Sequence, residues 1–367
     1  MKQYSIMIKP ASALCNMRCR YCFYEDESSL RGTAHCGLMS SATARRILEA
    51  FRAQQADRYA FVFQGGEPTL AGIEFFRAFS AMERELGYDK GRVSHAIQTN
   101  GLLMDAQWAE YFKENKYLVG LSLDGTRDIH DHFRPDAAGE GSYKRVIKAA
   151  ELMNRAGVDF NILTVVTPSL ARHIGSVFRD LVKHDFRYQQ YIICLPPMRE
   201  GEQSYTPDEN TLESFLKQLF DLWYKEFMAG NYISVRYFDN LVYMLQGQPP
   251  ELCSMCGHCN IQYLIEADGS VYPCDFYALD EYRLGNILTD SIEDIDRRRM
   301  ELGFIQASMA VPEECKKCRW AALCRNGCRR ERQDGPGGKN IHCRAYRSFF
   351  EHAYPGLMQI ARMTALA

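Results

Sequence analysis

The chain has 367 residues, 46% of them hydrophobic, and 44 Lys and Arg residues nearly balance 46 Asp and Glu residues, giving a net charge of −2. This balance argues against a general nucleic-acid binder, which would carry a basic excess, and the length allows one large domain and a smaller one. No basic segment followed by an apolar run opens the chain, and no stretch approaches eighteen consecutive apolar residues. We therefore expect a cytoplasmic protein without a membrane partner.

The first 200 residues alternate between two kinds of segment. Six short segments rich in Val, Ile, Phe and Tyr predict strands at 4–9, 59–64, 93–98, 117–123, 159–166 and 188–194. Between them, helical periodicity, in several cases opened by a Ser or Asp cap, predicts helices at 40–52, 72–86, 105–114, 142–156 and 169–183. Repeated strand-helix units predict a parallel sheet with right-handed crossovers.

Polar motifs follow most of these strands, which is where the sites of βα barrels are built. Six units are too few to close an eight-stranded barrel, so the expected fold class is α/β, a partial (β/α)6 TIM-like barrel over residues 1–230. Its open side suits a large substrate such as a peptide. Beyond it we expect a bridge at 231–252, a cysteine-rich domain at 253–346 and a closing helix at 347–367.

The fourteen cysteines are grouped, with four between 15 and 36, one at 194 and nine between 253 and 343. In a long chain without a secretion signal, such groups indicate metal or cluster ligation rather than disulfides. Cys15, Cys19 and Cys22 directly follow the first strand and supply three thiolates, whereas an iron-sulfur cube is normally held by four. One iron would be left open to a small molecule. A zinc site with a fourth ligand from elsewhere is the alternative.

The run C-N-M-R-C-R-Y-C-F-Y at 15–24 resembles the radical S-adenosylmethionine (SAM) enzymes, in which SAM chelates the open iron and is cleaved to a 5'-deoxyadenosyl radical. These enzymes hold the SAM ammonium at a Gly-Gly-Glu-Pro motif like the one at 65–68, because paired glycines let the backbone approach a ligand. The resemblance implies SAM as a cofactor. Its contacts would be Tyr21, Gly65, Gly66, Glu67, Ser122, Arg134 and Leu195.

The later cysteines resemble the SPASM extension of peptide-modifying radical SAM enzymes, which carries two auxiliary 4Fe-4S clusters. The resemblance assigns Cys253, Cys259, Cys274 and Cys328 to one cluster, and Cys315, Cys318, Cys324 and Cys343 to the other. Cys256 is left over, and whether it replaces Cys253 or Cys259 stays open. Cys36 and Cys194 are expected to be structural thiols. A pair of zinc knots is the alternative for this domain.

A more specific resemblance covers nearly the whole chain. The segments I-K-P-A-S at 8–12, F-Q-G-G-E-P-T-L-A-G at 63–72 and D-G-S-V-Y-P-C-D-F-Y at 268–277 resemble anaerobic sulfatase-maturating enzymes. This implies oxidation of a sulfatase cysteine or serine to Cα-formylglycine, with Asp275 as the base that takes the thiol or hydroxyl proton. The auxiliary clusters would take the electron. Tyr24, Gln64 and Asn100, at strand ends, are predicted substrate contacts.

The resemblance also implies three 4Fe-4S clusters, an unfolded or nascent sulfatase polypeptide as substrate, and a reduced flavodoxin or ferredoxin-type electron donor. We expect a monomer. One other function is a SPASM maturase that crosslinks a ribosomal peptide, which is disfavoured because only fourteen residues precede Cys15, too few for a leader-binding domain. Another is an iron-sulfur electron carrier or zinc-stapled binding module, without a SAM pocket. The choice between cysteine and serine targets stays open.

Overall fold

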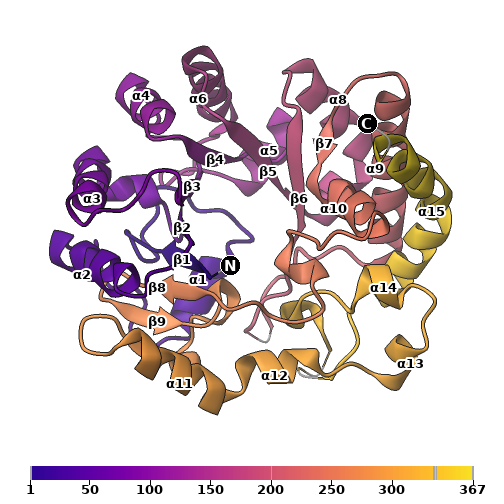
Figure 1. Cartoon of the computed structure of the whole chain (residues 1–367). Coiled ribbons are helices and arrows are strands. Elements are labelled where there is room, and N and C mark those ends of the chain that lie inside the picture. The colour runs from indigo at the N-terminus through magenta and orange to yellow at the C-terminus, as the bar shows by residue number, and fades with distance from the viewer. Residues whose placement is uncertain (1, 200, 334, 336, 366–367) are drawn as a thin grey trace.

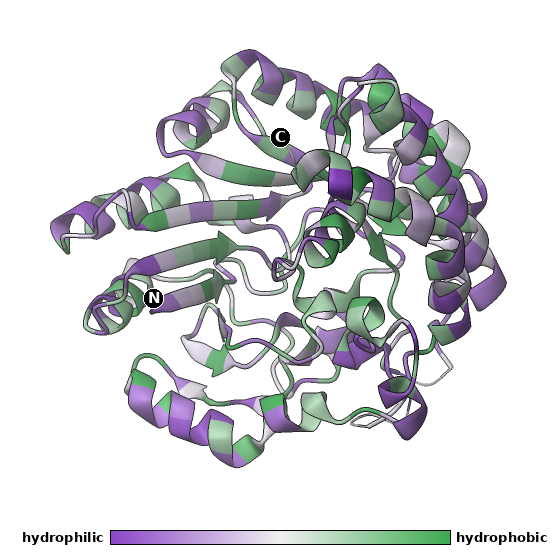
Figure 2. Cartoon of the chain, turned by 45° about the vertical axis from the view of Figure 1, so that its right-hand side comes forward, coloured by the Kyte–Doolittle hydropathy of each residue, from purple (hydrophilic) through white to green (hydrophobic). Residues whose placement is uncertain are grey.

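A computed structural model describes residues 2–199, 201–333, 335 and 337–365. Helices surround the outer side of a curved sheet, and the cysteine-rich part lies along its lower side in Figure 1. In Figure 2 the strands and the outer helices both carry hydrophobic and hydrophilic residues. Among the described residues, no helix is both long enough and apolar enough to cross a bilayer.

The central sheet confirms the predicted partial barrel. Its first six strands lie side by side in chain order and run parallel, and each begins and ends within one residue of its predicted bounds. They are β1 (Gln3–Ile8), β2 (Arg58–Phe63), β3 (Val93–Thr99), β4 (Tyr117–Ser122), β5 (Phe160–Val166) and β6 (Tyr188–Ile193).

The sheet is longer at both edges than the sequence predicted. The bridge expected at 231–252 contains a two-residue strand, β7 (Ser234–Val235), parallel to β6, and the helix α10 (Arg236–Leu245). At the other edge, β8 (Tyr263–Ile265) runs parallel to β1 and continues into the antiparallel strands β9 (Ser270–Tyr272) and β10 (Gly285–Asn286). The cysteine-rich part therefore extends the barrel sheet, and the ends of β1 and β8 are neighbours.

The helices between the strands also match their predicted positions. They are α2 (Ser41–Arg52), α3 (Ile73–Glu85), α4 (Ala106–Glu114), α6 (Tyr143–Ala156) and α8 (Ile174–Lys183), with α7 (Pro168–Arg172) split from α8 at His173. Ser40 and Asp105 act as the predicted caps, because each side chain accepts a hydrogen bond from a backbone N–H in the first turn of its helix.

Other helices carry or surround the cysteine segments. Short helices α1 (Phe23–Ser29) and α5 (Arg127–Phe133) follow β1 and β4. The cysteine-rich part contains α11 (Ile292–Leu302), α12 (Phe304–Met309), α13 (Glu313–Lys316) and α14 (Ala321–Cys324). The closing helix α15 (Cys343–Ala365) packs on α9 (Glu209–Met228) and α10; it begins four residues before its predicted start, and residues 366–367 lie outside the described residues.

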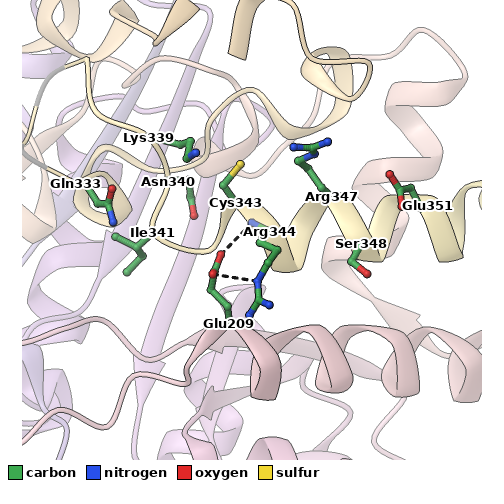
Figure 3. A pocket seen from close by; sticks show the side chains of 10 residues that line it. All are labelled: Glu209, Gln333, Lys339, Asn340, Ile341, Cys343, Arg344, Arg347, Ser348 and Glu351. Atoms are coloured by element: carbon green, nitrogen blue, oxygen red, sulfur yellow. Dashed lines mark hydrogen bonds and ion pairs between the residues drawn. The ribbon is translucent and has the colours of Figure 1, made fainter. Parts of the chain in front are cut away.

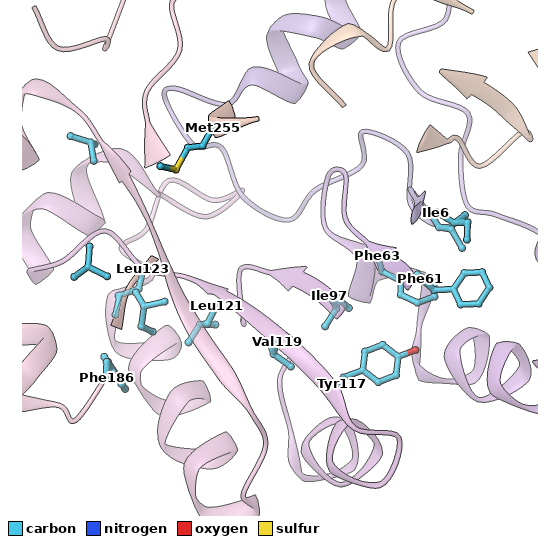
Figure 4. Packing of buried hydrophobic residues seen from close by; sticks show 14 of the residues in the cluster. Ile6, Phe61, Phe63, Ile97, Tyr117, Val119, Leu121, Leu123, Phe186 and Met255 are labelled. Carbon is cyan, nitrogen blue, oxygen red and sulfur yellow. The ribbon is translucent and has the colours of Figure 1, made fainter. Parts of the chain in front are cut away.

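Alternating strand residues form the core between the sheet and the helices. Phe61 and Phe63 of β2 are fully buried, and their rings meet those of Phe79 and Phe76 of α3 at 5.4 and 5.0 Å. Tyr117 from β4 continues this layer (Figure 4). Because side chains on a strand alternate between its faces, the residues between these point into the barrel. The strand ends are thus held by a rigid aromatic layer.

Candidate active site

Cys15, Cys19 and Cys22 lie on the loop between β1 and α1. The loop is fixed by backbone hydrogen bonds, including one from Arg20 N to Phe133 O at 3.0 Å. Burial raises the pKa of the Cys15 thiol to about 11 and that of Cys19 to about 12, and the neighbouring loop thiols add to both rises. The three thiols are therefore near enough to influence one another's pKa, and each is half-buried on the loop. Binding a common group would require them to lose their protons.

Gly65 and Gly66 pack directly against this cysteine loop. A Cβ on Gly66 would lie 2.1 Å from the carbonyl oxygen of Leu14, and Gly65 has a φ of +123°, a conformation that favours glycine. The amide of Gly66 donates to Ser12 O at 2.8 Å. Among the described residues, no hydrogen-bond donor reaches the carbonyl oxygens of the two glycines. These carbonyls remain able to accept from a ligand ammonium.

Glu67, a predicted SAM contact, and Asn100, a predicted substrate contact, are hydrogen-bonded to one another next to the cysteine loop. The buried Glu67 carboxylate accepts hydrogen bonds from Thr69, from the Thr99 hydroxyl and from the Asn100 amide N–H at 2.7 Å. The Asn100 side chain donates to Asn16 at 2.7 Å and lies 3.8 Å from the Cys15 sulfur. Both residues thus brace the cysteine loop, and Asn100 is grouped with that loop rather than with Tyr24 and Gln64.

A cluster of three interacting side chains, Arg134, Asp124 and Tyr21, lies beside Cys19. The Arg134 guanidinium donates to Asp124 at 3.0 Å, stacks over the Tyr21 ring at 5.4 Å, and approaches the Cys19 sulfur at 4.0 Å. The Tyr21 hydroxyl donates to the same Asp124 oxygen. Asp124 is not among the predicted site residues, although its position just after β4 was the signal that could have found it. Ser122 and Leu195 lie half-buried at the ends of β4 and β6.

Asp275 is hydrogen-bonded to two residues of the barrel part, Tyr24 and Gln64. Its Oδ2 accepts from the Tyr24 hydroxyl at 2.7 Å and from the Gln64 amide, whose nitrogen also lies 2.9 Å from the Tyr24 oxygen. Its Oδ1 is buried and has no hydrogen-bond partner among the described residues. Burial raises the pKa of Asp275 to about 6, against the opposing charge of Lys9. The structure thus brings together three of the predicted residues, Asp275, Tyr24 and Gln64.

A buried ion-pair network behind Asp275 was missed by the sequence analysis. Lys9, next to the end of β1, places Nζ 2.8 Å from Glu266 Oε1 and 4.9 Å from the centre of the Tyr24 ring. Arg31 donates to the same Glu266 oxygen at 2.6 Å, and Glu27 lies 4.0 Å from Lys9. Lys9, directly after the apolar residues Ile6, Met7 and Ile8 of a predicted strand, was the available signal, because buried charges require partners.

The remaining cysteines form two separate groups. Burial raises the pKa of Cys274 well above its usual value and that of Cys328 to about 12, and nearby thiols add to both rises. This criterion links Cys253, Cys259, Cys274 and Cys328, which are called the inner cysteine set, and it also links Cys256 to Cys253. By the same criterion the outer cysteine set is Cys315, Cys318, Cys324 and Cys343. The resemblance implies the same two sets without Cys256, and the choice of cluster ligands stays a prediction.

Cys256 is oriented differently from its neighbours. Its thiol lies 3.6 and 3.9 Å from the carbonyl oxygens of Leu252 and Pro250, as a thiol that donates to the backbone would.

Cys194 is buried with its thiol 3.7 Å from Leu195 O, and Cys36 lies 4.0 Å from the Arg31 guanidinium. Across the described ranges, no three His, Cys, Asp or Glu side chains are grouped as ligands of one metal ion.

Comparison with known families defines the class of protein. A model of the radical SAM superfamily matches residues 10–180, and a model of the SPASM iron-sulfur cluster-binding domain matches residues 253–319. Together with the partial barrel and its cysteine loop, these matches define a radical SAM enzyme with a SPASM domain. The second match ends before Cys324, Cys328 and Cys343.

Individual relatives define the family. The chain is 42% identical to the cysteine-type anaerobic sulfatase-maturating enzyme of Clostridium perfringens, over 98% of this chain and 99% of the relative. It is 29% identical to the serine-type enzyme of Bacteroides thetaiotaomicron, over 96% and 90%. The structure of native anSMEcpe with bound AdoMet and Cp18Cys peptide superposes with a TM-score of 0.92, at 40% identity and 99% coverage of both chains. The chain belongs to the anaerobic sulfatase-maturating enzymes, which generate formylglycine in sulfatases.

Proposed function

We propose that this enzyme oxidises a cysteine, rather than a serine, of its sulfatase substrate. The proposal is supported by the higher identity to the cysteine-type relative, 42% against 29% for the serine-type one. A structurally similar relative also binds a peptide named Cp18Cys. We infer that the polypeptide is presented unfolded or nascent, because the target side chain must reach the buried Asp275.

Cys15, Cys19 and Cys22 would hold the cluster to which SAM binds. Gly65 and Gly66 would offer carbonyls to SAM, with Tyr21, Arg134, Ser122 and Leu195 around it and Glu67 bracing the loop. When bound, SAM and the clusters supply hydrogen-atom abstraction and electron transfer. The inner and outer cysteine sets would hold the two auxiliary clusters, which makes three clusters and about twelve irons per chain.

Asp275 is the proposed base, and its unpartnered Oδ1 is the observation that carries the mechanism. Tyr24 and Gln64 bind Oδ2 and fix the carboxylate, which leaves Oδ1 free to accept the proton of the target thiol. A general base must lie within hydrogen-bond reach of the proton it removes. Loss of one hydrogen atom from Cβ, one thiol proton and one electron converts the cysteine to a thioaldehyde. Water then replaces the sulfur and gives the aldehyde.

The test is anaerobic turnover with two matched peptides. Reconstituted enzyme is incubated with SAM, dithionite and a peptide carrying either Cys or Ser in the context (C/S)-x-P-x-R. We expect 5'-deoxyadenosine and aldehyde with the cysteine peptide and much less aldehyde with the serine peptide. Equal aldehyde from both peptides would refute the cysteine preference, and no aldehyde from either would refute the proposed mechanism. The cytoplasmic location, the monomeric state and the electron donor remain predictions.

A further inference from the structure

His130 is fully buried on α5, and both nitrogens of its ring are hydrogen-bonded. Nδ1 lies 3.1 Å from the backbone nitrogen of Asp124, just after β4, and Nε2 lies 2.9 Å from the Ser142 hydroxyl. That hydroxyl in turn lies 2.6 Å from the backbone carbonyl oxygen of Arg134. The ring therefore connects the two residues, Asp124 and Arg134, whose side chains form the buried ion pair beside Cys19.

The direction of each hydrogen bond around the His130 ring follows from the groups involved. A backbone N–H can only donate, so Nδ1 of His130 accepts from Asp124 and carries no proton. A backbone carbonyl can only accept, so the Ser142 hydroxyl donates its proton to Arg134 and accepts from Nε2. All three bonds are therefore made only by the neutral ring with its proton on Nε2. Burial lowers the pKa of His130 to about 4, which agrees with a neutral ring.

The His130 ring joins the segments on either side of α5. Residues 123–126, before the helix, belong to no helix or strand, and Arg134 directly follows its last residue. The backbone N–H of Arg134 also donates to His130 O at 2.7 Å and closes the last turn. Through its two nitrogens the ring thus fixes the loop at Asp124 and, by way of Ser142, the main chain at Arg134. An apolar ring of the same size would fill the space without holding either end.

The ion pair held in this way is shielded from water. Asp124 and Arg134 are both buried, and Asp124 Oδ1 accepts a further bond from the Val165 N–H at 2.9 Å. By contrast, Arg344 pairs with Glu209 at 3.2 Å on the surface (Figure 3), and 59% of the arginine side chain is exposed. Water can replace the partner of an exposed charge, whereas a buried guanidinium depends on a correctly placed carboxylate. The main-chain position of Asp124 therefore decides where the guanidinium of Arg134 lies.

We propose that His130 is a positioning residue for the SAM site, which fixes the main chain at Asp124 and Arg134 so that the Arg134 guanidinium stays beside Cys19. This inference rests on the proposed function, in which Arg134 is one of the SAM contacts. Both ring nitrogens are used within the chain, so His130 acts through Arg134 and not on SAM itself. Loss of the ring nitrogens should weaken SAM binding while all the proposed cluster ligands remain in place.

The first test measures the equilibrium dissociation constant for SAM of the reconstituted full chain. His130→Phe keeps a buried ring and removes both nitrogens, so the constant should rise about tenfold, as when a partner that orients a ligand-binding group is lost. His130→Asn keeps an acceptor near the position of Nδ1 and should recover part of the affinity. The matched control is Tyr111→Phe, which removes a buried hydroxyl bonded to Ser80 and to the Phe76 carbonyl and should leave SAM affinity unchanged. Iron content equal to the wild type shows that each variant is loaded.

A second variant covers the case in which His130→Phe does not fold. Ser142→Ala cuts the connection between the ring and Arg134 with a smaller change in volume, and it should also weaken SAM binding. Hydrogen exchange of the reconstituted enzyme without SAM provides a readout that is independent of activity. Peptides covering residues 120–135 should exchange faster in His130→Phe and in Ser142→Ala than in the wild type, and at the wild-type rate in Tyr111→Phe.

A double-mutant cycle tests whether His130 acts through Arg134. Arg134→Met alone should weaken SAM binding, and adding His130→Phe should weaken it little further, because no guanidinium is left to position. Wild-type SAM affinity in His130→Phe or in Ser142→Ala, an equal loss in Tyr111→Phe, or full additivity of His130→Phe and Arg134→Met would overturn the positioning role. Failure of the wild type to bind SAM or to form aldehyde would instead refute the proposed function, independently of His130.

Discussion

The hydroxyl of Tyr24 donates a hydrogen bond to Asp275 at 2.7 Å, although the two residues are 251 positions apart. Tyr24 follows the cysteine loop of the barrel, and Asp275 follows Cys274 of the SPASM domain. The pairing of β8 with β1 makes this contact possible, because it places the end of the SPASM hairpin beside the first strand of the barrel. The cysteine loop and the proposed proton acceptor thus follow strands of one sheet, β1 and β9.

Replacing the proposed base should separate SAM cleavage from peptide oxidation. Asp275→Asn keeps the shape of the side chain but removes the acceptor charge, so we expect 5'-deoxyadenosine to form while aldehyde falls by about 10²- to 10⁴-fold. Both products are measured in the same anaerobic reaction with the cysteine peptide. Glu281→Gln, which neutralises an exposed acid nearby, is the control and should leave both unchanged. Full aldehyde formation by Asp275→Asn would remove Asp275 as the base.

Replacement of Tyr21, on the cysteine loop, and of Tyr24, in α1, should have different effects. Tyr24→Phe removes a donor to Asp275, and a hydrogen bond to a charged group contributes about 1.5–3 kcal/mol, so aldehyde should fall by about tenfold to a hundredfold with less effect on SAM cleavage. Tyr21→Phe removes a donor to Asp124 beside Arg134 and should lower both products together. The ratio of aldehyde to deoxyadenosine is the readout. The same ratio in both variants would contradict the separation of the two sites.

Lys9 should be important for stability as well as for the position of Tyr24. Lys9→Met leaves Glu266 with Arg31 alone and Glu27 without its cation, and removal of one partner from a buried ion network costs about 3–5 kcal/mol. Anaerobic denaturant unfolding should show a correspondingly lower midpoint. Arg45→Met breaks the exposed Arg45–Glu85 pair and should have a far smaller effect. Equal losses of stability in the two variants would show that the buried ion pairs of Lys9 contribute no more to stability than the exposed Arg45–Glu85 pair.

Local signals account for what the sequence could predict. Each of the first six strands and the helices between them could be found from short-range periodicity, and the cysteine spacings pointed to the radical SAM and SPASM classes. The strand β7 is only two residues long and left no periodicity to detect. The Arg31–Glu266 pair joins residues 235 positions apart, so only the β1–β8 pairing reveals it. The sequence also could not show which way a side chain points, as the examples of Asn100 and Cys256 illustrate.

The direction of the Cys256 thiol leads to the last prediction. Cys256 is spaced like a ligand, but its sulfur lies against the carbonyls of Leu252 and Pro250, whereas Cys253 and Cys259 belong to the inner cysteine set. Cys256→Ser should therefore keep the full iron content of about twelve per chain and near wild-type aldehyde formation. Cys253→Ser should lose up to about four irons, because a cubane cluster normally requires four thiolates. Iron and sulfide analysis of anaerobically purified variants makes the comparison, with Cys36→Ser as a control outside both sets. If Cys256→Ser loses iron and Cys253→Ser keeps its full iron content, then Cys256 and not Cys253 is the cluster ligand.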